Sequence, residues 1–302
     1  MDVSKEPPNQ QLFGQPPTAS MPSLLDNWSI EVMPRTAAKI GDFRQMLPAG
    51  TRVYLAHIDG TPIDDMVATA RRLHLEGFAV MPHIPARSIA DAGTLKDWLD
   101  RYRSEADVRQ ALLLAGGNSS PRGTFGSSLD LVETGLFDRM GFTNLHFAGH
   151  PEGNRDIDGD LSTRQVDAAL LTKQAYAERT DARVALTTQF GFDAKPIIDW
   201  TQRIAALGVD LPVHVGIAGP ARLQTLLKYA LSCGVGPSLQ ILQKRALDVR
   251  RLLLPYEPTE IVDELEAYKR SHPQSLLAKI HMFPLGGIEA AVRWYRKRSQ
   301  TQ

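Results

Sequence analysis

The chain of 302 residues is longer than a typical single domain but has the usual length of one barrel of eight strand–helix units. Its 34 Lys and Arg residues balance its 34 Asp and Glu residues, so no strong field would attract nucleic acid or an acidic membrane surface. The single cysteine, Cys233, excludes an intrachain disulfide framework and fits a reducing compartment. No apolar run approaches about 18 residues. We therefore expect a cytoplasmic protein with neither a nucleic-acid nor a membrane partner.

The first 23 residues, from Met1 to Ser23, are rich in Pro, Gln and Ser and lack the apolar core of a secretory signal. Acidic Asp2 and Glu6 stand where such a signal carries positive charge. We expect a flexible N-terminal segment over residues 1–23 and one catalytic domain over residues 24–302. Docking of the segment onto that domain, or onto a second subunit, is the alternative.

From Trp28 onward, short β-rich runs alternate with helical patterns of about 10 to 20 residues, as in repeated parallel crossovers. Gly77, Gly141 and Gly208 each fall between a helical pattern and the next strand, where a left-handed helix terminus favours glycine. The predicted strands are Trp28–Met33, Arg52–Ile58, Phe78–Ile84, Gln110–Ala115, Asn144–His150, Arg183–Gln189, Leu211–Ile217 and Leu277–Phe283.

Eight such units predict an α/β fold, a single-domain (β/α)8 TIM barrel. A doubly wound open sheet is the alternative, but no G-x-G-x-x-G motif follows the first strand. The segment from Gly234 to Ser271 is expected to add two or three helices before the eighth strand, interrupted by Pro255 and Pro258.

Histidines gather at the predicted strand ends, which surround one cavity in such a barrel. If they converged on zinc or iron, the protein would be a metal-dependent hydrolase. The first strand has no H-x-H pair, however, and no carboxylate pattern accompanies the histidines. A hydrogen-bonding role is preferred for each one, and no metal ligand is predicted. The histidines concerned are His57, His83, His150, His214 and His281.

Two other strand-end residues are candidates for chemistry. Glu31 has apolar neighbours, so an inward-pointing carboxyl would be partly desolvated and biased toward the protonated form of a general acid. A Glu exposed at the strand end, near the next helix N-terminus, is the alternative. Gln189 ends the sixth strand, where its amide offers a donor and an acceptor to a polar ring system. A Gln that caps a turn is the alternative.

Six short motifs, in order and at the predicted strand ends, resemble those of the methylenetetrahydrofolate reductase family. The resemblance covers most of the chain from Trp28 to Arg298. It implies a barrel enzyme of one-carbon metabolism that interconverts 5,10-methylenetetrahydrofolate and 5-methyltetrahydrofolate, using a hydride from NADH or NADPH that FAD carries in most members. The motifs are Ser29-Ile30-Glu31-Val32-Met33-Pro34, Pro82-His83, Gly149-His150-Pro151-Glu152-Gly153-Asn154, Thr188-Gln189-Phe190-Gly191-Phe192-Asp193, Val215-Gly216-Ile217 and His281-Met282-Phe283-Pro284-Leu285-Gly286.

The resemblance also implies roles for single residues. Glu31 would be the general acid, Gln189 would bind the pterin, and Leu223 takes the place of a Phe that contacts folate. Two departures affect the flavin pocket: Gly116-Gly117-Asn118 stands where the family has R-G-D, and Ala56-His57 replaces a Thr at the second strand end. The implied cofactor contacts are His83, Gly116, Gly117, Asn118, Gly149, His150, Asn154, Asp167 and Lys173.

Several alternatives stay open at this point. FAD would bind a modified pocket in which Gly116 and Gly117 let the backbone approach the ring, or NADH would reduce folate directly without flavin. The enzyme could instead oxidise methyltetrahydrofolate, or the chain could be a silent folate-binding regulator or a metal hydrolase. The family's C-terminal regulatory domain is not expected, and a homo-oligomer is left open.

Overall fold

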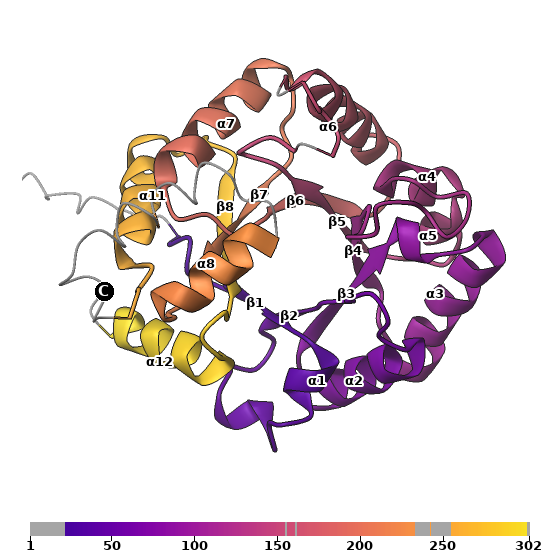
Figure 1. The fold of residues 1–302 in the computed structure, drawn as a ribbon, viewed down its shortest axis with the longest axis horizontal. Helices are drawn as coiled ribbons and strands as arrows, with labels where there is room; N and C mark the ends of the chain where they lie inside the picture. Colours follow the sequence, from indigo (N-terminus) through magenta and orange to yellow (C-terminus); the bar gives the residue numbers. More distant parts are fainter. Residues whose placement is uncertain (1–21, 155, 161, 233–241, 243–254, 301–302) are drawn as a thin grey trace, which may run out of the picture.

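The computed structural model describes residues 22–154, 156–160, 162–232, 242 and 255–300. Eight parallel strands pair in sequence order and close into one barrel, surrounded by helices (Figure 1). Pairing of Ser29 with His281 joins the first strand to the last. The strands are β1 Ser29–Val32, β2 Arg52–Leu55, β3 Ala79–Pro85, β4 Gln110–Leu114, β5 Asn144–Gly149, β6 Arg183–Thr188, β7 Val213–Ala218 and β8 Leu277–Phe283. All eight predicted strands, and the TIM-barrel fold, are confirmed.

The helices follow the strands around the outside of the barrel (Figure 1). Gly77, Gly141 and Gly208, which precede β3, β5 and β7, have φ angles of 90°, 69° and 91°, the left-handed conformation predicted for them. The helices are α1 Pro34–Ala37, α2 Ile63–Leu75, α3 Ala92–Ala106, α4 Ser128–Glu133, α5 Leu136–Arg139, α6 Arg164–Ala177, α7 Ala194–Ala206, α8 Leu223–Ser232, α11 Thr259–Ser271 and α12 Ile288–Ser299, with 3-10 turns η1 Phe43–Gln45 and η2 Ala86–Ser88.

Two predictions fall wholly or partly outside the described residues. The N-terminal segment 1–23 is described only at residues 22 and 23, so its predicted flexibility lies outside them. Of the helices expected between Gly234 and Ser271, the described part contains α11, which begins after Pro258. In none of the described residues does a helix have the length and apolar character needed to cross a membrane.

Side chains alternate between the two faces of each strand, as the pleat requires. Outward residues such as Ile30, Val53 and Leu113 pack with the helices into one large apolar core. A second apolar cluster joins α8 to the loops after β6 and β7, through Leu223, Phe190 and neighbouring residues. The inward face of the barrel is therefore separated from both clusters and is free to be polar.

The residues just before β1 are anchored to the barrel by buried hydrogen bonds. Glu266 on α11 is 4% exposed and accepts from the backbone N of Leu24 at 2.7 Å and from Ser23 Oγ at 2.5 Å. The Leu24 carbonyl accepts from Ile280 N on β8 at 2.8 Å. This carboxylate thus satisfies a buried N–H group that has no partner in the sheet.

Replacing Glu266 by Ala is expected to lower the free energy of unfolding by about 2 to 3 kcal/mol, because a buried N–H would lose a charged acceptor. Urea unfolding checks this value. Glu264, exposed on the same helix, is the matched control, and its replacement by Ala should change stability by less than about 0.5 kcal/mol. Equal losses in the two variants would contradict the anchoring role.

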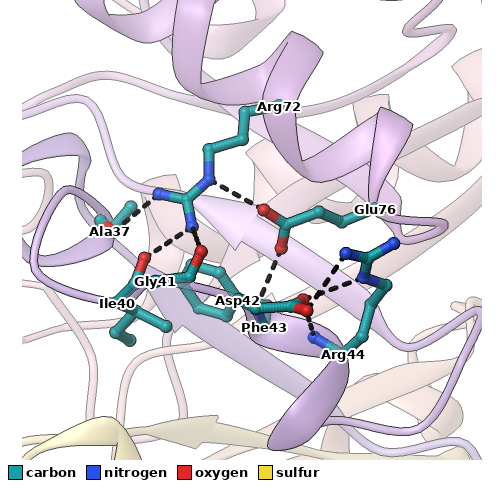
Figure 2. Close-up of polar contacts among 8 residues, drawn as sticks. All are labelled: Ala37, Ile40, Gly41, Asp42, Phe43, Arg44, Arg72 and Glu76. Carbon is teal, nitrogen blue, oxygen red and sulfur yellow. Dashed lines mark hydrogen bonds and ion pairs between the residues drawn. The ribbon is translucent and has the colours of Figure 1, made fainter.

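Arg72 on α2 holds the loop that connects β1 to β2 (Figure 2). Its guanidinium donates to the carbonyls of Ala37, Ile40 and Gly41 at 3.0, 2.5 and 3.0 Å, and its Nε donates to Glu76 at 2.8 Å. Glu76 in turn accepts from the backbone N of Phe43 at 3.0 Å. The pair ties the loop to α2 at several points, so it contributes more than a single surface ion pair would.

We expect Arg72→Ala to lower the free energy of unfolding by about 2 kcal/mol, because several carbonyl groups lose one charged donor. Arg71, the exposed neighbour on α2, provides the comparison, since Arg71→Ala should change stability by only about 0.5 kcal/mol. Thermal or urea unfolding measures both. A loss no greater than that of Arg71→Ala would show that the loop does not depend on this clamp.

Candidate active site

Met81 on β3 and Leu112 on β4 make one side of the barrel interior apolar, and the strands around the rest of it carry polar side chains there. These polar side chains are all buried, none being more than 5% exposed. They come from β1, β2, β5, β6, β7 and β8, and they are Ser29, Tyr54, His146, Thr187, His214 and His281.

Tyr54 is the centre of this polar layer. Its hydroxyl lies 2.6 Å from His146 Nδ1, 3.2 Å from Thr187 Oγ1 and 3.4 Å from His214 Nδ1. Burial raises the pKa of Tyr54 to about 12 and lowers the pKa of His214 to about 3, where nearby Arg52 and Lys279 add to the effect. Burial likewise lowers the pKa of His146 well below its usual range. Tyr54, His146 and His214 are therefore uncharged at neutral pH.

Glu31 lies two residues after Ser29 on β1, nearer the C-terminal ends of the strands, and stands between two histidines. Its Oε2 atom is 3.4 Å from His83 Nε2 on β3 and 3.8 Å from His281 Nε2 on β8. The Glu31 side chain is 20% exposed, His83 is 12% exposed and His281 is fully buried. Glu31 is also the one acidic residue on the eight strands, all of whose residues are described.

The two histidines present unpaired nitrogen atoms to this carboxyl group. Nε2 of His83 and Nε2 of His281 are both buried and make no hydrogen bond. Burial lowers the pKa of His83 to about 4, although the Glu31 carboxylate opposes the shift, so the ring is neutral at pH 7. His281 Nδ1 lies 2.9 Å from Ser29 Oγ. We assign the hydroxyl as the donor, which leaves the ring proton of His281 on Nε2, facing Glu31.

The wall beside this group is aromatic. Phe283, two residues after His281 on β8, is partly exposed, and its ring lies edge-on to His281 at 4.8 Å and to Phe190 at 5.4 Å. The centroid of the Tyr54 ring lies 4.2 Å from that of the His281 ring. These contacts restrain the ring plane of His281, and the Glu31 side chain keeps 20% of its surface exposed.

The two predicted substrate-binding residues, Gln189 and Leu223, make their contacts with residues other than Glu31. Gln189 is exposed, and its Oε1 accepts from the backbone N of Phe190 at 3.1 Å, the turn-capping alternative that the sequence left open. Leu223 is 7% exposed and packs in the apolar cluster around Phe190, Phe192 and Tyr256.

Of the residues predicted as cofactor contacts, Gly116, Gly117 and Asn118 lie in the loop after β4, Gly149 is the last residue of β5, and His150 and Asn154 follow it. Gly116 has a φ angle of 97°, and an added Cβ would lie 3.0 Å from Pro85. Gly149 is packed so closely that a Cβ would lie 2.8 Å from the Trp200 ring. Gly117 is exposed, and Asn118 contacts Asp59 and Ser88. His150 lies 3.5 Å from Asn154, and burial lowers the pKa of His150 to about 4.

Two further predicted cofactor contacts, Asp167 and Lys173, are on α6 and interact with α7 and β5. Asp167 pairs with Arg203 on α7 at 2.5 Å. Lys173 is 5% exposed, donates to the Ala148 carbonyl at 3.0 Å and lies over the Phe147 ring. Burial lowers the pKa of Lys173 to about 8. The sequence left open an exposed helical lysine, whereas the structure buries it against β5.

Within the described ranges, no group of three or more His, Cys, Asp or Glu side chains has the geometry to hold a metal ion. The histidines considered as ligands divide between the polar layer, the Glu31 group and separate loops. His57, for example, bonds the Thr61 carbonyl at 3.0 Å. The metal-hydrolase alternative therefore has no support in this part of the chain.

Sequence reasoning missed most of the polar layer. It concentrated on strand ends, whereas Tyr54 and His146 lie in mid-strand. The signal was present in the alternation Arg52, Tyr54 on β2 and Asn144, His146 on β5, which places polar residues on every second position of strands that are otherwise apolar. In a buried strand such a pattern marks the barrel interior.

No protein-family model matches the chain. Among solved structures, it is similar to a mannotriose complex of the β-mannanase of Thermomonospora fusca, with 12% identity, a TM-score of 0.45 and coverage of 86% of this chain and 78% of that chain. It is also similar to the catalytic domain of a mannanase from Streptomyces sp. SirexAA-E, with 15% identity, a TM-score of 0.39 and coverage of 76% and 82%. At these values neither likeness carries an inference about substrate.

The functional prediction is corrected by these findings. No family model of a reductase matches, and the similar solved structures are mannanases, which are hydrolases and not oxidoreductases. The predicted methylenetetrahydrofolate reductase activity, with or without flavin, was therefore wrong, as were FAD and NADH or NADPH as cofactors. The physical reason is that the six motifs are short strand-end segments, in which Gly and Pro recur for reasons of turn geometry.

Proposed function

We propose that the protein is an enzyme that transfers a proton next to a carbonyl group of a small molecule bound at the C-terminal end of the barrel. The observation that carries this proposal is the convergence of two unpaired imidazole nitrogens on one carboxyl group: Nε2 of His83 and Nε2 of His281 at Glu31. A carboxylate base beside a neutral imidazole that polarises a carbonyl is a combination suited to enolisation.

In the proposed step, the Glu31 carboxylate takes a proton from the carbon next to the carbonyl. The electron pair of the C–H bond forms a C=C bond, and the carbonyl electrons move to oxygen, which gains negative charge. The N–H groups of His83 and His281 would donate hydrogen bonds to that oxygen. Exchange of the carboxyl proton with solvent, followed by return of a proton to the same carbon as the carbonyl group re-forms, completes a hydrogen exchange.

Glycoside hydrolysis does not fit this site as well. The usual mechanisms need two carboxyl groups on either side of the scissile bond. The eight strands, whose residues are all described, carry Glu31 alone. A proton transfer that uses one carboxyl group and two imidazoles matches the residues at this position better.

The experiment is deuterium incorporation from D2O into a panel of 2-oxo acids, aldoses, ketoses and their phosphates, followed by proton NMR. Catalysed exchange at the carbon next to the carbonyl is the expected result, with heat-denatured protein as the background. If no member of the panel exchanged faster than that background, the proposed reaction class would be wrong.

We also propose a cytoplasmic location and a small molecule as the only kind of partner that the site requires. The single cysteine and the balance of charge support both.

A further inference from the structure

A cavity of about 280 Å³ lies near the C-terminal ends of β2, β3 and β4. It lies between the loop after β2, the turn after β3, the loop after β4 and α3. Its lining combines charged, polar and aromatic side chains with the backbone of one tight loop. The lining residues that matter here are His57, Asp59, Ser88, Trp98 and Arg122.

Arg122 is held at the rim by a loop that is fastened at several points. Its backbone N donates to the carbonyl of Arg87 at 2.9 Å. The guanidinium of Arg87 donates to the carbonyls of Gly126 and Asn118 at 3.1 and 3.0 Å. Gly123 lies so close to Ala90 that an added Cβ would overlap its carbonyl oxygen. These contacts hold the backbone of Arg122 at the rim of the cavity.

The partner of Arg122 is easily displaced. Arg122 Nη2 is 2.7 Å from Asp59 Oδ1, and the two side chains are 56% and 53% exposed. Such an exposed pair contributes at most about 1 kcal/mol, so a ligand oxyanion can replace the aspartate. Asn118 Nδ2 is 3.4 Å from both Asp59 and Ser88 Oγ, which adds polar groups on the same side. A guanidinium in this setting suits a carboxylate or a phosphate.

Another part of the cavity lining is formed by two rings, those of His57 and Trp98, and one ring nitrogen there makes no hydrogen bond. The rings of His57 and Trp98 lie 5.0 Å apart at an angle of 32°. His57 Nε2 bonds the Thr61 carbonyl at 3.0 Å and must donate there, so Nδ1 is an acceptor, and it is buried with no hydrogen-bond partner. A ligand with a planar portion and a hydroxyl or amine donor would complement this wall.

We propose that this cavity binds the anionic end of a small molecule, a carboxylate or a phosphate, with Arg122 as its anchor and Trp98 and His57 as its wall. The inference deepens the proposed function, because it rests on that function in assigning the other end of the molecule to Glu31. The two sites are built from adjoining elements: His57 follows β2, which pairs with β1 at Glu31, and Ser88 follows β3, the strand that carries His83.

Trp98 provides a direct test. It is partly exposed, whereas the other three tryptophans, Trp28, Trp200 and Trp294, are at most 5% exposed. Its indole N–H signal in a nitrogen-15 correlation spectrum is assigned by its loss in Trp98→Phe. The full-length protein is then titrated with pyruvate and with inorganic phosphate at constant ionic strength. We expect a saturable shift of this signal with at least one probe, and the probe that saturates identifies the anion.

Arg122→Gln should weaken that binding at least about 10-fold, equivalent to about 1.4 kcal/mol. Arg164→Gln, which removes an exposed arginine paired with Asp160 outside the cavity, should leave it unchanged. No saturable shift with either probe, or equal affinity in Arg122→Gln and the wild type, would overturn the inference. Because the titration needs no turnover, binding without proton exchange would disprove the Glu31 reaction and leave this site standing.

Discussion

Lowering the pH from about 6 to about 4 is expected to reduce the free energy of unfolding by about 5 kcal/mol through His83 and His214 alone. Burial lowers the pKa of His83 to about 4 and that of His214 to about 3, from an ordinary value of 6.5. Above pH 6.5 both states of the chain hold these rings neutral. As the pH falls below 6.5, the unfolded chain takes up protons that the folded protein cannot accept, at about 1.4 kcal/mol per pH unit for each histidine.

The free energy of unfolding therefore decreases as the pH falls, and the decrease ends only when the pH reaches the pKa values of the folded state. His146, whose pKa burial also lowers, acts in the same direction. Since proteins are stable by only about 5 to 15 kcal/mol, this loss is a large part of the total by the time the pH reaches about 4.

Urea unfolding at pH 7.5, 6, 5 and 4.5 measures this dependence. His214→Gln should reduce the slope of the unfolding free energy against pH, below pH 6, by about 1.4 kcal/mol per pH unit. The reason is that the variant lacks one histidine that takes up a proton only in the unfolded chain. His272 is exposed, and His272→Gln should leave the slope as it is in the wild type. A free energy of unfolding that stays constant from pH 7.5 to 4.5 would show that the interior histidines take up protons without unfolding.

Glu31→Gln is expected to reduce proton exchange by a factor of about 10² to 10⁴, the range typical of a general acid–base group. Glutamine keeps the shape of the side chain and can still lie between His83 and His281, but it cannot take a proton from carbon at neutral pH. Binding of substrate should change little, so the loss should appear in the maximal exchange rate and not in the concentration needed for half saturation.

The control for this variant is Glu133→Gln, which alters an exposed glutamate on α4 and should exchange as the wild type does. Near-ultraviolet circular dichroism checks that both variants keep native packing. His83→Gln provides a second comparison, with a smaller expected loss, because His281 still donates to the developing oxyanion. Wild-type exchange rates in Glu31→Gln would rule out this carboxyl group as the base.

The fold could be read from the sequence because its signals are local. Each strand is a short apolar run of β-branched and aliphatic residues, each helix shows an apolar stripe, and Gly77, Gly141 and Gly208 mark the turns between them. Such patterns depend on the burial of neighbouring residues and on backbone conformation, so they survive without knowledge of distant contacts. The number of strand–helix units then left the closed barrel as the favoured architecture.

The importance of Glu31 could also be anticipated, since a carboxyl group within an apolar strand needs a reason to be there. The residues that surround Glu31 in the folded protein could not be anticipated from the sequence. Ser29 and His281 are 252 residues apart, and only closure of the barrel between β1 and β8 brings them together. The same holds for Tyr54 and His146, which are 92 residues apart and meet across the interior.

Lys173 and Gln189 are residues whose contacts the tertiary structure decides, and their predicted binding roles stay predictions. The lysine lies against β5 because α6 packs that face inward, and the glutamine amide bonds its own turn. By itself the sequence determined the eight units, their order and the place of Glu31 on β1, while the facing of its carboxyl group stayed open, because hydrophobic period and turn chemistry are properties of adjacent residues. Only the tertiary structure decided which imidazoles face that carboxyl group and which polar atoms stay unpaired, because those depend on barrel closure and on the register between strands far apart in the chain.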